Sequence, residues 1–110
     1  NGKKHREGDL PADITFFENG KTQKEIWYQN DKLHRENDLP ALVEYYENGK
    51  KEKEIWYRND EKYREGNLPF RIKFYESGNK KEISWGNQKV INTNCFDENE
   101  NVTYRYAISF

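Results

Sequence analysis

HRENDLPALVEYYENGKKEKEIWYRND, residues His34–Asp60, decides the fold, because the chain contains nearly the same stretch twice. The earlier copy is His5–Asp31, which is identical to it at 18 of 27 positions, and the interval from His5 to His34 defines the repeat period. A third, looser copy begins with YREGNLPF at Tyr63–Phe70. Periods of about 20–50 residues are typical of stacked supersecondary units, because one unit alone cannot bury its apolar face. The sequence therefore predicts three units, at about residues 1–31, 32–60 and 61–89.

Each unit has the pattern of two β-strands joined by a tight turn. Apolar residues alternate with their neighbours at Ala12, Ile14 and Phe16, and this period of two indicates a half-buried strand. An Asn-Gly pair follows, and then the second strand KEIWY at Lys24–Tyr28. Helix caps are absent, and Asn-Gly or Pro interrupts each run. We expect an all-β fold, in which antiparallel β-hairpin repeats form an elongated, curved meander sheet.

The length of the turn determines which residues share a face of the sheet. A two-residue Asn-Gly loop would place Ile14 opposite Glu25. A three-residue loop, Glu18–Gly20 with its glycine in the left-handed region, places Ile14 and Ile26 on one face instead. We expect the three-residue loop in the first two units.

The third unit differs, because its KEI segment at Lys81–Ile83 aligns with the earlier copies only after a one-residue deletion. A two-residue turn at Gly78–Asn79 would compensate for that deletion and restore the faces. On this alignment Trp27 and Trp56 are equivalent. We expect Trp85 to take the position of the tyrosines that follow those two tryptophans.

The segment 90–110 departs from the repeat and predicts a C-terminal capping hairpin. Its strands are expected at Val90–Phe96 and Val102–Phe110, on either side of a polar loop at Asp97–Asn101. Alternating apolar residues in its second strand suit a cap over the third unit. The residues that we expect it to bury are Val102, Tyr104, Tyr106 and Ile108.

Composition and motifs argue against several classes of function. The net charge is −1 with lysine and glutamate interleaved, which gives no basic footprint for nucleic acid, and no apolar stretch is long enough for a membrane span. The single cysteine, Cys95, excludes an internal disulfide and a cysteine-based zinc site. No nucleophile or phosphate-binding motif is present, so we expect no catalytic residue and no cofactor. His5 and His34 share a repeat position with Tyr63, and this interrupted series predicts packing rather than a metal site.

An aromatic strip with a charged rim is the best candidate for a binding surface, since Tyr and Trp dominate interface hot spots. The predicted partner-binding residues are Phe17, Trp27, Tyr46, Trp56 and Tyr75, with Glu25 and Glu54 on the rim. The alternative is that these aromatics complete a sandwich with the Leu-Pro connections. Both interpretations remain open at the level of sequence.

The Asn-Gly-Lys turns, the Trp-Tyr pair and the HRE-x-D-x-P-A segment resemble MORN-type repeat proteins. The similarity is closest to the degenerate variant of bacterial antitoxin-like proteins and of phage and giant-virus repeat proteins, and it covers residues 1–89. The chain lacks the Tyr-x-Gly core of the shorter, glycine-richer standard repeat. The resemblance implies antiparallel hairpins in a curved sheet. It also implies a non-catalytic scaffold, a lipid-associated anchor or a partner-neutralising protein.

We therefore expect a non-catalytic module that neutralises or tethers one partner protein, as an antitoxin or a phage-encoded inhibitor would. One alternative is a structural protein that assembles edge to edge. Another is single-stranded nucleic acid binding by aromatic stacking, against which the near-neutral charge argues. The chain contains no methionine and starts in mid-repeat. We expect a cytoplasmic location, or secretion if a leader was cleaved before Asn1.

Overall fold

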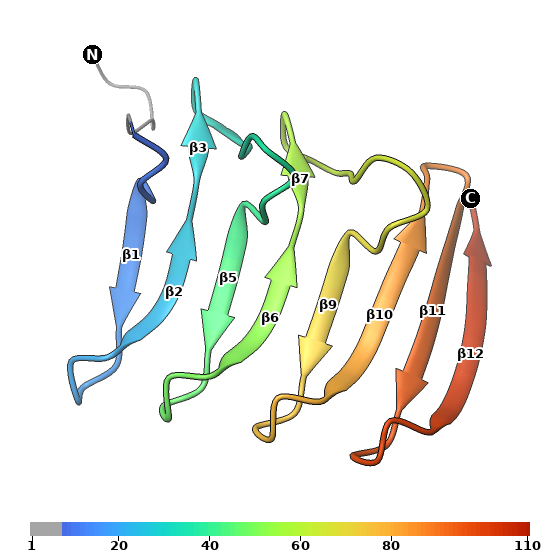
Figure 1. Cartoon of the computed structure of the whole chain (residues 1–110). Helices are drawn as coiled ribbons and strands as arrows, with labels where there is room; N and C mark the ends of the chain where they lie inside the picture. Colours follow the sequence, from blue (N-terminus) through green and yellow to red (C-terminus); the bar gives the residue numbers. More distant parts are fainter. Residues whose placement is uncertain (1–7) are drawn as a thin grey trace.

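The computed structural model describes residues 8–110, and all regular structure within that range is β. Eight strands form one antiparallel sheet, and four short ones form two separate hairpins (Figure 1). The sheet consists, in order, of β1 (Asp13–Phe16), β2 (Thr22–Ile26), β5 (Leu42–Tyr45), β6 (Lys51–Ile55), β9 (Arg71–Phe74), β10 (Lys80–Gly86), β11 (Val90–Phe96) and β12 (Val102–Ser109). The hairpins are β3 (Tyr28–Gln29) with β4 (Lys32–Leu33), and β7 (Tyr57–Arg58) with β8 (Glu61–Lys62).

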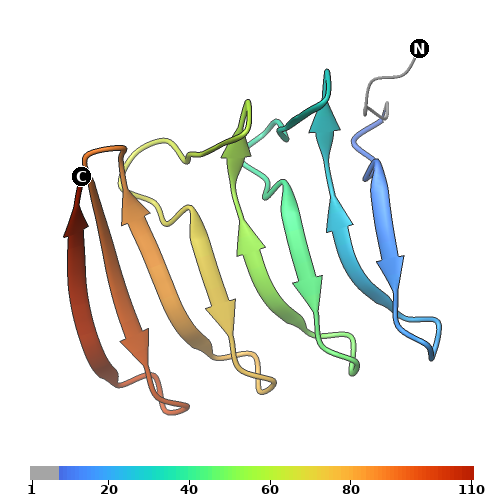
Figure 2. The ribbon, with the colours of Figure 1, turned by 180° about the vertical axis from the view of Figure 1, so that it is seen from behind.

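The sheet is a single layer in which neighbours in sequence are neighbours in space. Figures 1 and 2, which view the sheet from opposite sides, show the tight turns at one end of the strands and the longer connections at the other end. Burial therefore comes from side chains that pack beside one another and beneath those connections. Two small clusters form the core of the described chain, one around Trp27 and Val43 and one around Trp56 and Ile72.

The three-residue loop expected in the first unit is present. The backbone N–H of Phe17 donates to the carbonyl of Lys21 at 2.8 Å, and Gly20 has a φ of 85°. Only glycine adopts that conformation without steric cost. The second unit closes in the same way, with a hydrogen bond of 2.9 Å from Tyr46 to Lys50.

The expected consequence of that loop, a shared face for Ile14 and Ile26, is wrong. A β-bulge at Gln23 inserts one further residue into β2, so that Ile14 pairs with Glu25. The three-residue loop and the bulge each shift the register by one residue, and the two shifts cancel. Isoleucines 14 and 26 therefore lie on opposite faces of the sheet.

The third unit has the same turn as the other two, so the expected two-residue turn at Gly78–Asn79 is wrong. Tyr75 donates its backbone N–H to Asn79 at 2.9 Å, which encloses three loop residues. A bulge at Lys81 follows, one repeat period after the bulge at Glu52. No residue has been deleted.

The position of Trp85 follows from this register and corrects a second expectation. The backbone N–H of Phe70 donates to Ser84 at 3.0 Å, as that of Ala41 donates to Ile55 at 3.0 Å. Ser84 therefore corresponds to Ile55, and Trp85 corresponds to Trp56. The expectation that Trp85 takes the position of the tyrosine after that tryptophan is wrong. Relative to the backbone hydrogen bonds, the sequence KEI therefore lies one residue earlier in the third unit than in the first two.

The C-terminal hairpin is present, with Asp97 and Asn101 closing its loop through a 2.9 Å backbone hydrogen bond. It extends the sheet instead of covering it. The expected burial of its apolar residues is wrong, because β12 is exposed along its whole length. The exposed fractions are 42% for Val102, 63% for Tyr104, 41% for Tyr106 and 48% for Ile108. In an outermost strand, an alternating apolar row lies on a face that no other element covers.

Candidate functional site

Arg35 joins the first two hairpins. Its guanidinium carbon lies 3.7 Å from the ring centre of Trp27, within the range of a cation–π interaction. Its Nε and Nη2 donate to the two carboxylate oxygens of Asp9 at 3.0 and 3.1 Å, and Nη1 donates to the carbonyl of Pro40 at 3.1 Å. The Trp27 indole donates to the carbonyl of Asp9 at 3.1 Å. We call this set of contacts an arginine staple.

A second arginine staple lies one repeat period further along the chain. Arg64 lies 4.0 Å from the ring centre of Trp56, donates to both oxygens of Asp38 at 2.9 and 3.2 Å, and donates to Pro69 at 3.0 Å. The Trp56 indole donates to the Asp38 carbonyl at 2.9 Å. The predicted equivalence of Trp27 and Trp56 is thus confirmed, and each is only 7% exposed.

The third tryptophan has no staple. One repeat period separates Thr93 from Arg64 and Asn67 from Asp38, so both the cation and the carboxylate are missing at Trp85. On the opposite face of the sheet a buried hydroxyl pair is found, with Ser84 Oγ and Thr93 Oγ1 2.9 Å apart. The C-terminal hairpin is attached by strand pairing, by this hydroxyl contact, and by hydrogen bonds from Tyr75 to the carbonyl of Phe96 and from Asn79 to that of Glu98.

The predicted aromatic strip is divided between the two faces of the sheet. Side chains alternate along a strand, and directly paired residues share a face. Lys24, Glu44 and Lys73 belong to one row of residues paired across the strands, and so share a face of the sheet. Phe17, Tyr46 and Tyr75 each follow a residue of that row by two positions and therefore lie on the same face. Trp27, Trp56, Glu25 and Glu54 lie on the opposite face, in the rows of Val43 and Ala41.

Tyr46 and Tyr75, the two tyrosines of the predicted aromatic strip, link successive hairpins through their hydroxyl groups. Tyr46 donates to the carbonyl of Phe74, and Tyr75 donates to that of Phe96, both at 2.6 Å. Burial, followed by the charge of nearby glutamates, raises the pKa of Tyr46, so its hydroxyl stays protonated as a donor. Phe17, at the same repeat position, has no hydroxyl and is half-buried.

The rim glutamates are also engaged within the sheet. Glu25 accepts a 2.5 Å hydrogen bond from the Tyr45 hydroxyl. Burial, followed by that hydrogen bond, raises the pKa of Tyr45. Glu54 accepts from Lys51 at 3.0 Å. These contacts make both carboxylates structural partners of neighbouring side chains.

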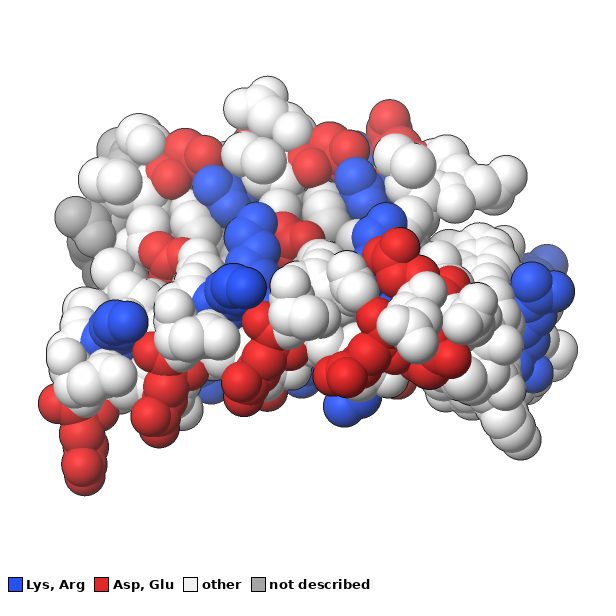
Figure 3. Space-filling model, turned by 60° about the horizontal axis from the view of Figure 1, so that its bottom comes forward, with Lys and Arg blue, Asp and Glu red and all other residues white. Residues whose placement is uncertain are grey.

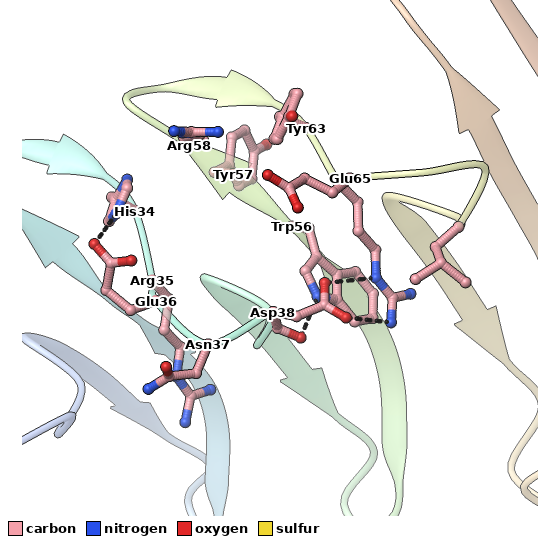
Figure 4. A pocket seen from close by; sticks show the side chains of 12 residues that line it. His34, Arg35, Glu36, Asn37, Asp38, Trp56, Tyr57, Arg58, Tyr63 and Glu65 are labelled. Carbon is pink, nitrogen blue, oxygen red and sulfur yellow. Dashed lines mark hydrogen bonds and ion pairs between the residues drawn. The ribbon is translucent and has the colours of Figure 1, made fainter.

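A cleft of about 470 Å³ lies between the two connections that carry the staples (Figure 4). His34 lines it, and both of its ring nitrogens are engaged, Nε2 with Glu36 at 2.8 Å and Nδ1 with the backbone N–H of Asn59 at 3.3 Å. Arg35 and Arg64 line it too, held in their staples. Within residues 8–110, no group of three or more metal-ligating side chains is placed to hold an ion. His5, the other predicted member of the histidine position, lies outside the described residues.

The largest accessible set of apolar side chains belongs to β12, which the sequence pattern assigns to the interior. This eight-residue strand carries one charged residue, Arg105, and no proline. At the end of the molecule where β12 lies, Figure 3 shows mostly uncharged side chains, with basic side chains along the outermost margin. Strand edges in native proteins are usually blunted by lysine, proline or a short length. Most of β12 has none of these, which makes it the best candidate for a contact surface.

Comparison with protein-family models, with curated proteins and with solved structures finds no match to this chain. In the described part of the chain, no helix is long and apolar enough to cross a membrane.

Proposed function

We propose that the chain is a non-catalytic protein-interaction module, built from β-hairpin repeats, that presents the edge strand β12 to a partner protein. The observation that carries this proposal is the exposed row Tyr104, Tyr106 and Ile108 on a strand with one free edge. Val102, beyond the bulge at Thr103, is exposed on the other face. A partner strand can add its backbone hydrogen bonds to such an edge and place its side chains against the apolar row.

The two arginine staples support this role, because they fix the spacing of the repeat hairpins on which the C-terminal hairpin is built. Each staple joins a tryptophan, an arginine and an aspartate from neighbouring units. A rigid platform loses little conformational entropy when it binds, which favours affinity. The repeats then act as scaffold, and the C-terminal hairpin acts as the contact element.

The state of the other candidate residues supports a non-catalytic function. His34 has both nitrogens occupied, and the glutamates and tyrosines of the predicted strip bond to one another or to the backbone. These hydrogen bonds hold the side chains within the sheet and its connections, which is what a scaffold requires. A partner whose own strand is covered by β12 would be blocked or tethered, in keeping with the antitoxin-like and scaffold roles that the MORN resemblance implies.

Site-specific photocross-linking in the cell that produces the protein tests this proposal. A photoreactive phenylalanine analogue is placed at Tyr104, which is 63% exposed on β12. The matched control carries it at Phe16, which is 58% exposed on β1. We expect a protein adduct of defined mass from position 104 and none from position 16. Equal labelling at both positions, or no adduct at 104, refutes the proposal.

A further inference from the structure

We infer that the partner strand on β12 is β12 of a second copy, paired antiparallel about a two-fold axis at Tyr106. This inference rests on the proposed function and names the occupant of the same edge. It predicts a homodimer in which two eight-stranded sheets join into one continuous sheet. The orientation of the free backbone groups, the order of side chains and the available area carry the argument.

The backbone groups of β12 that face outward belong to the odd-numbered residues. Phe110 donates its N–H to Lys89, just before β11, at 2.8 Å, and the register pairs Ile108, Tyr106 and Tyr104 with β11 in the same way. Because backbone groups alternate along an antiparallel strand, those of Arg105, Ala107 and Ser109 point to the open side. They form a row of unpaired donors and acceptors.

A two-fold axis at Tyr106 matches these groups without placing like charges together. It pairs Arg105 of each copy with Ala107 of the other, so that both residues exchange hydrogen bonds. Tyr106 then faces its own symmetry mate, and Tyr104 faces Ile108. A shift of the axis to Arg105 would set two guanidinium groups opposite each other, which is destabilising.

The same register brings the apolar rows of the two strands together on one face. Tyr104, Tyr106 and Ile108 occupy the non-hydrogen-bonded positions of the new pair, where side chains across strands lie closest. Tyr104 and Tyr106 already contact each other edge to face, with ring centres 5.8 Å apart. Aromatic residues at the centre of an interface are the usual hot spots.

The available area fits a weak dimer. Tyr104, Tyr106 and Phe110 are 63%, 41% and 76% exposed. At about 200 Å² for a whole aromatic side chain, these fractions amount to roughly 360 Å² per copy. Val102, Ile108 and the backbone bring the total for two copies to about 1,000 Å², the lower limit of specific interfaces. We therefore expect association in the micromolar range.

Head-to-tail joining of β12 to β1 of another copy fits less well. Ala107 follows the bulge at Thr103 by the same number of residues as tryptophan follows the bulge in the other units. The β12 end of the sheet therefore has no tryptophan ring on which an arginine of a second copy could stack. Ile14 of β1 pairs with Glu25, and the pairing across the sheet places both on the face opposite to Tyr106. The apolar rows of the two strands would not meet.

Sedimentation velocity from low micromolar to several hundred micromolar protein tests the inference. We expect a monomer–dimer equilibrium. Tyr106→Lys should weaken it at least tenfold, because two ammonium groups would face each other. The matched control is Tyr63→Lys, since Tyr63 is 43% exposed on a connection far from β12 in sequence, and it should leave the equilibrium unchanged.

Two further variants separate loss of pairing from loss of folding. Ala107→Pro removes an outward N–H and no bond within the sheet, so it should abolish the dimer while the far-ultraviolet spectrum is retained. In a Cys95→Ala background, Tyr106→Cys should form an intermolecular disulfide, because paired Cα atoms at such positions lie about 4.5 Å apart. Ala107→Cys should not, because it faces residue 105.

Three outcomes overturn the inference. They are a monomer at every concentration, a dimer that Tyr106→Lys and Ala107→Pro leave intact, and polymers that grow with concentration, as head-to-tail joining produces. With a monomer, an adduct to another protein at position 104 would still support the proposed function. No adduct at all would refute the proposed function as well.

Discussion

Replacing Arg64 by alanine removes the centre of the second arginine staple and should destabilise the protein strongly. The side chain makes three kinds of contact at once: it stacks on Trp56, pairs with both oxygens of Asp38 and donates to the carbonyl of Pro69. Only 15% of the arginine side chain is exposed, whereas 51% of the aspartate side chain is. Solvent therefore weakens the ion pair but screens the stacked guanidinium much less.

The magnitude follows from these contacts. A partly desolvated cation–π contact contributes about 1 kcal/mol. A half-exposed bidentate ion pair contributes about 1 kcal/mol, and the hydrogen bond to Pro69 contributes about as much. Together, Arg64→Ala should lower the free energy of unfolding by about 3 kcal/mol. That is a large part of the roughly 5–15 kcal/mol that stabilises a typical domain.

Urea denaturation followed by tryptophan fluorescence measures this loss. With a denaturant dependence of about 1–3 kcal/mol per molar urea, the midpoint should fall by roughly 1–3 M. Arg58→Ala is the control, because Arg58 is exposed and lies 5.2 Å from the Tyr63 ring centre. It should cost no more than about 0.5–1 kcal/mol. Arg64→Lys should restore less than half of the loss, since lysine cannot form the planar fork.

Coupling between the partners separates a staple from an ordinary surface arginine. The effects of Arg64→Ala and Asp38→Ala should be non-additive in a double-mutant cycle, because each removes the same ion pair. If Arg64→Ala costs no more than Arg58→Ala, or if the cycle shows no coupling, the staple does not hold the hairpins together. Its proposed part in making the sheet rigid would then be refuted.

Three other predictions concern single side chains. Tyr46→Phe should cost about 1 kcal/mol in urea denaturation, because the carbonyl of Phe74 loses its donor. Burial, with a smaller effect of nearby charge, raises the pKa of the Cys95 thiol. Iodoacetamide should therefore react with the folded protein more slowly than with the unfolded one at pH 7.5, and the reaction should become faster as the pH rises. The backbone N–H of Asn101, with other loop donors, lowers the pKa of Asp97, so this carboxylate stabilises the fold above its unfolded pKa and loses that effect as the pH falls through its folded pKa. The stability difference between wild type and Asp97→Ala should therefore shrink from pH 7 toward pH 3, and an unchanged difference would contradict this linkage.

The strands and turns could be predicted from the sequence, whereas the register could not. The period-two pattern and the Asn-Gly pairs correctly indicate antiparallel hairpins and the loop at Glu18–Gly20. The bulge at Gln23 has no comparable signal, because any polar residue suits it. One inserted residue reverses the face of every residue beyond it, so the sequence pattern assigns Ile14 to the wrong face.

Trp85 shows that spacing is better evidence than identity of letters. Aligning the KEI of Lys81–Ile83 with the earlier copies requires a deletion, whereas a constant repeat period places Trp85 on Trp56 without one. Each turn and bulge occupies a fixed number of residues in every unit. The number of residues in each unit is therefore constant, even where side chains such as Ile83 and Ser84 differ from those of the earlier units.

The open edge could not be predicted from the strand pattern, because an alternating strand reads the same whether its apolar row is covered or not. Yet the end of the staple series is visible in the chain. Asn67 and Thr93 replace the aspartate and arginine of the staple, so no connection is stapled to Trp85 as one is to Trp56. A repeat unit that loses its staple loses the contacts that would fix a further unit. The sheet then ends in β12, whose apolar row lies on the face opposite to the tryptophans and is exposed for a strand from another molecule to cover.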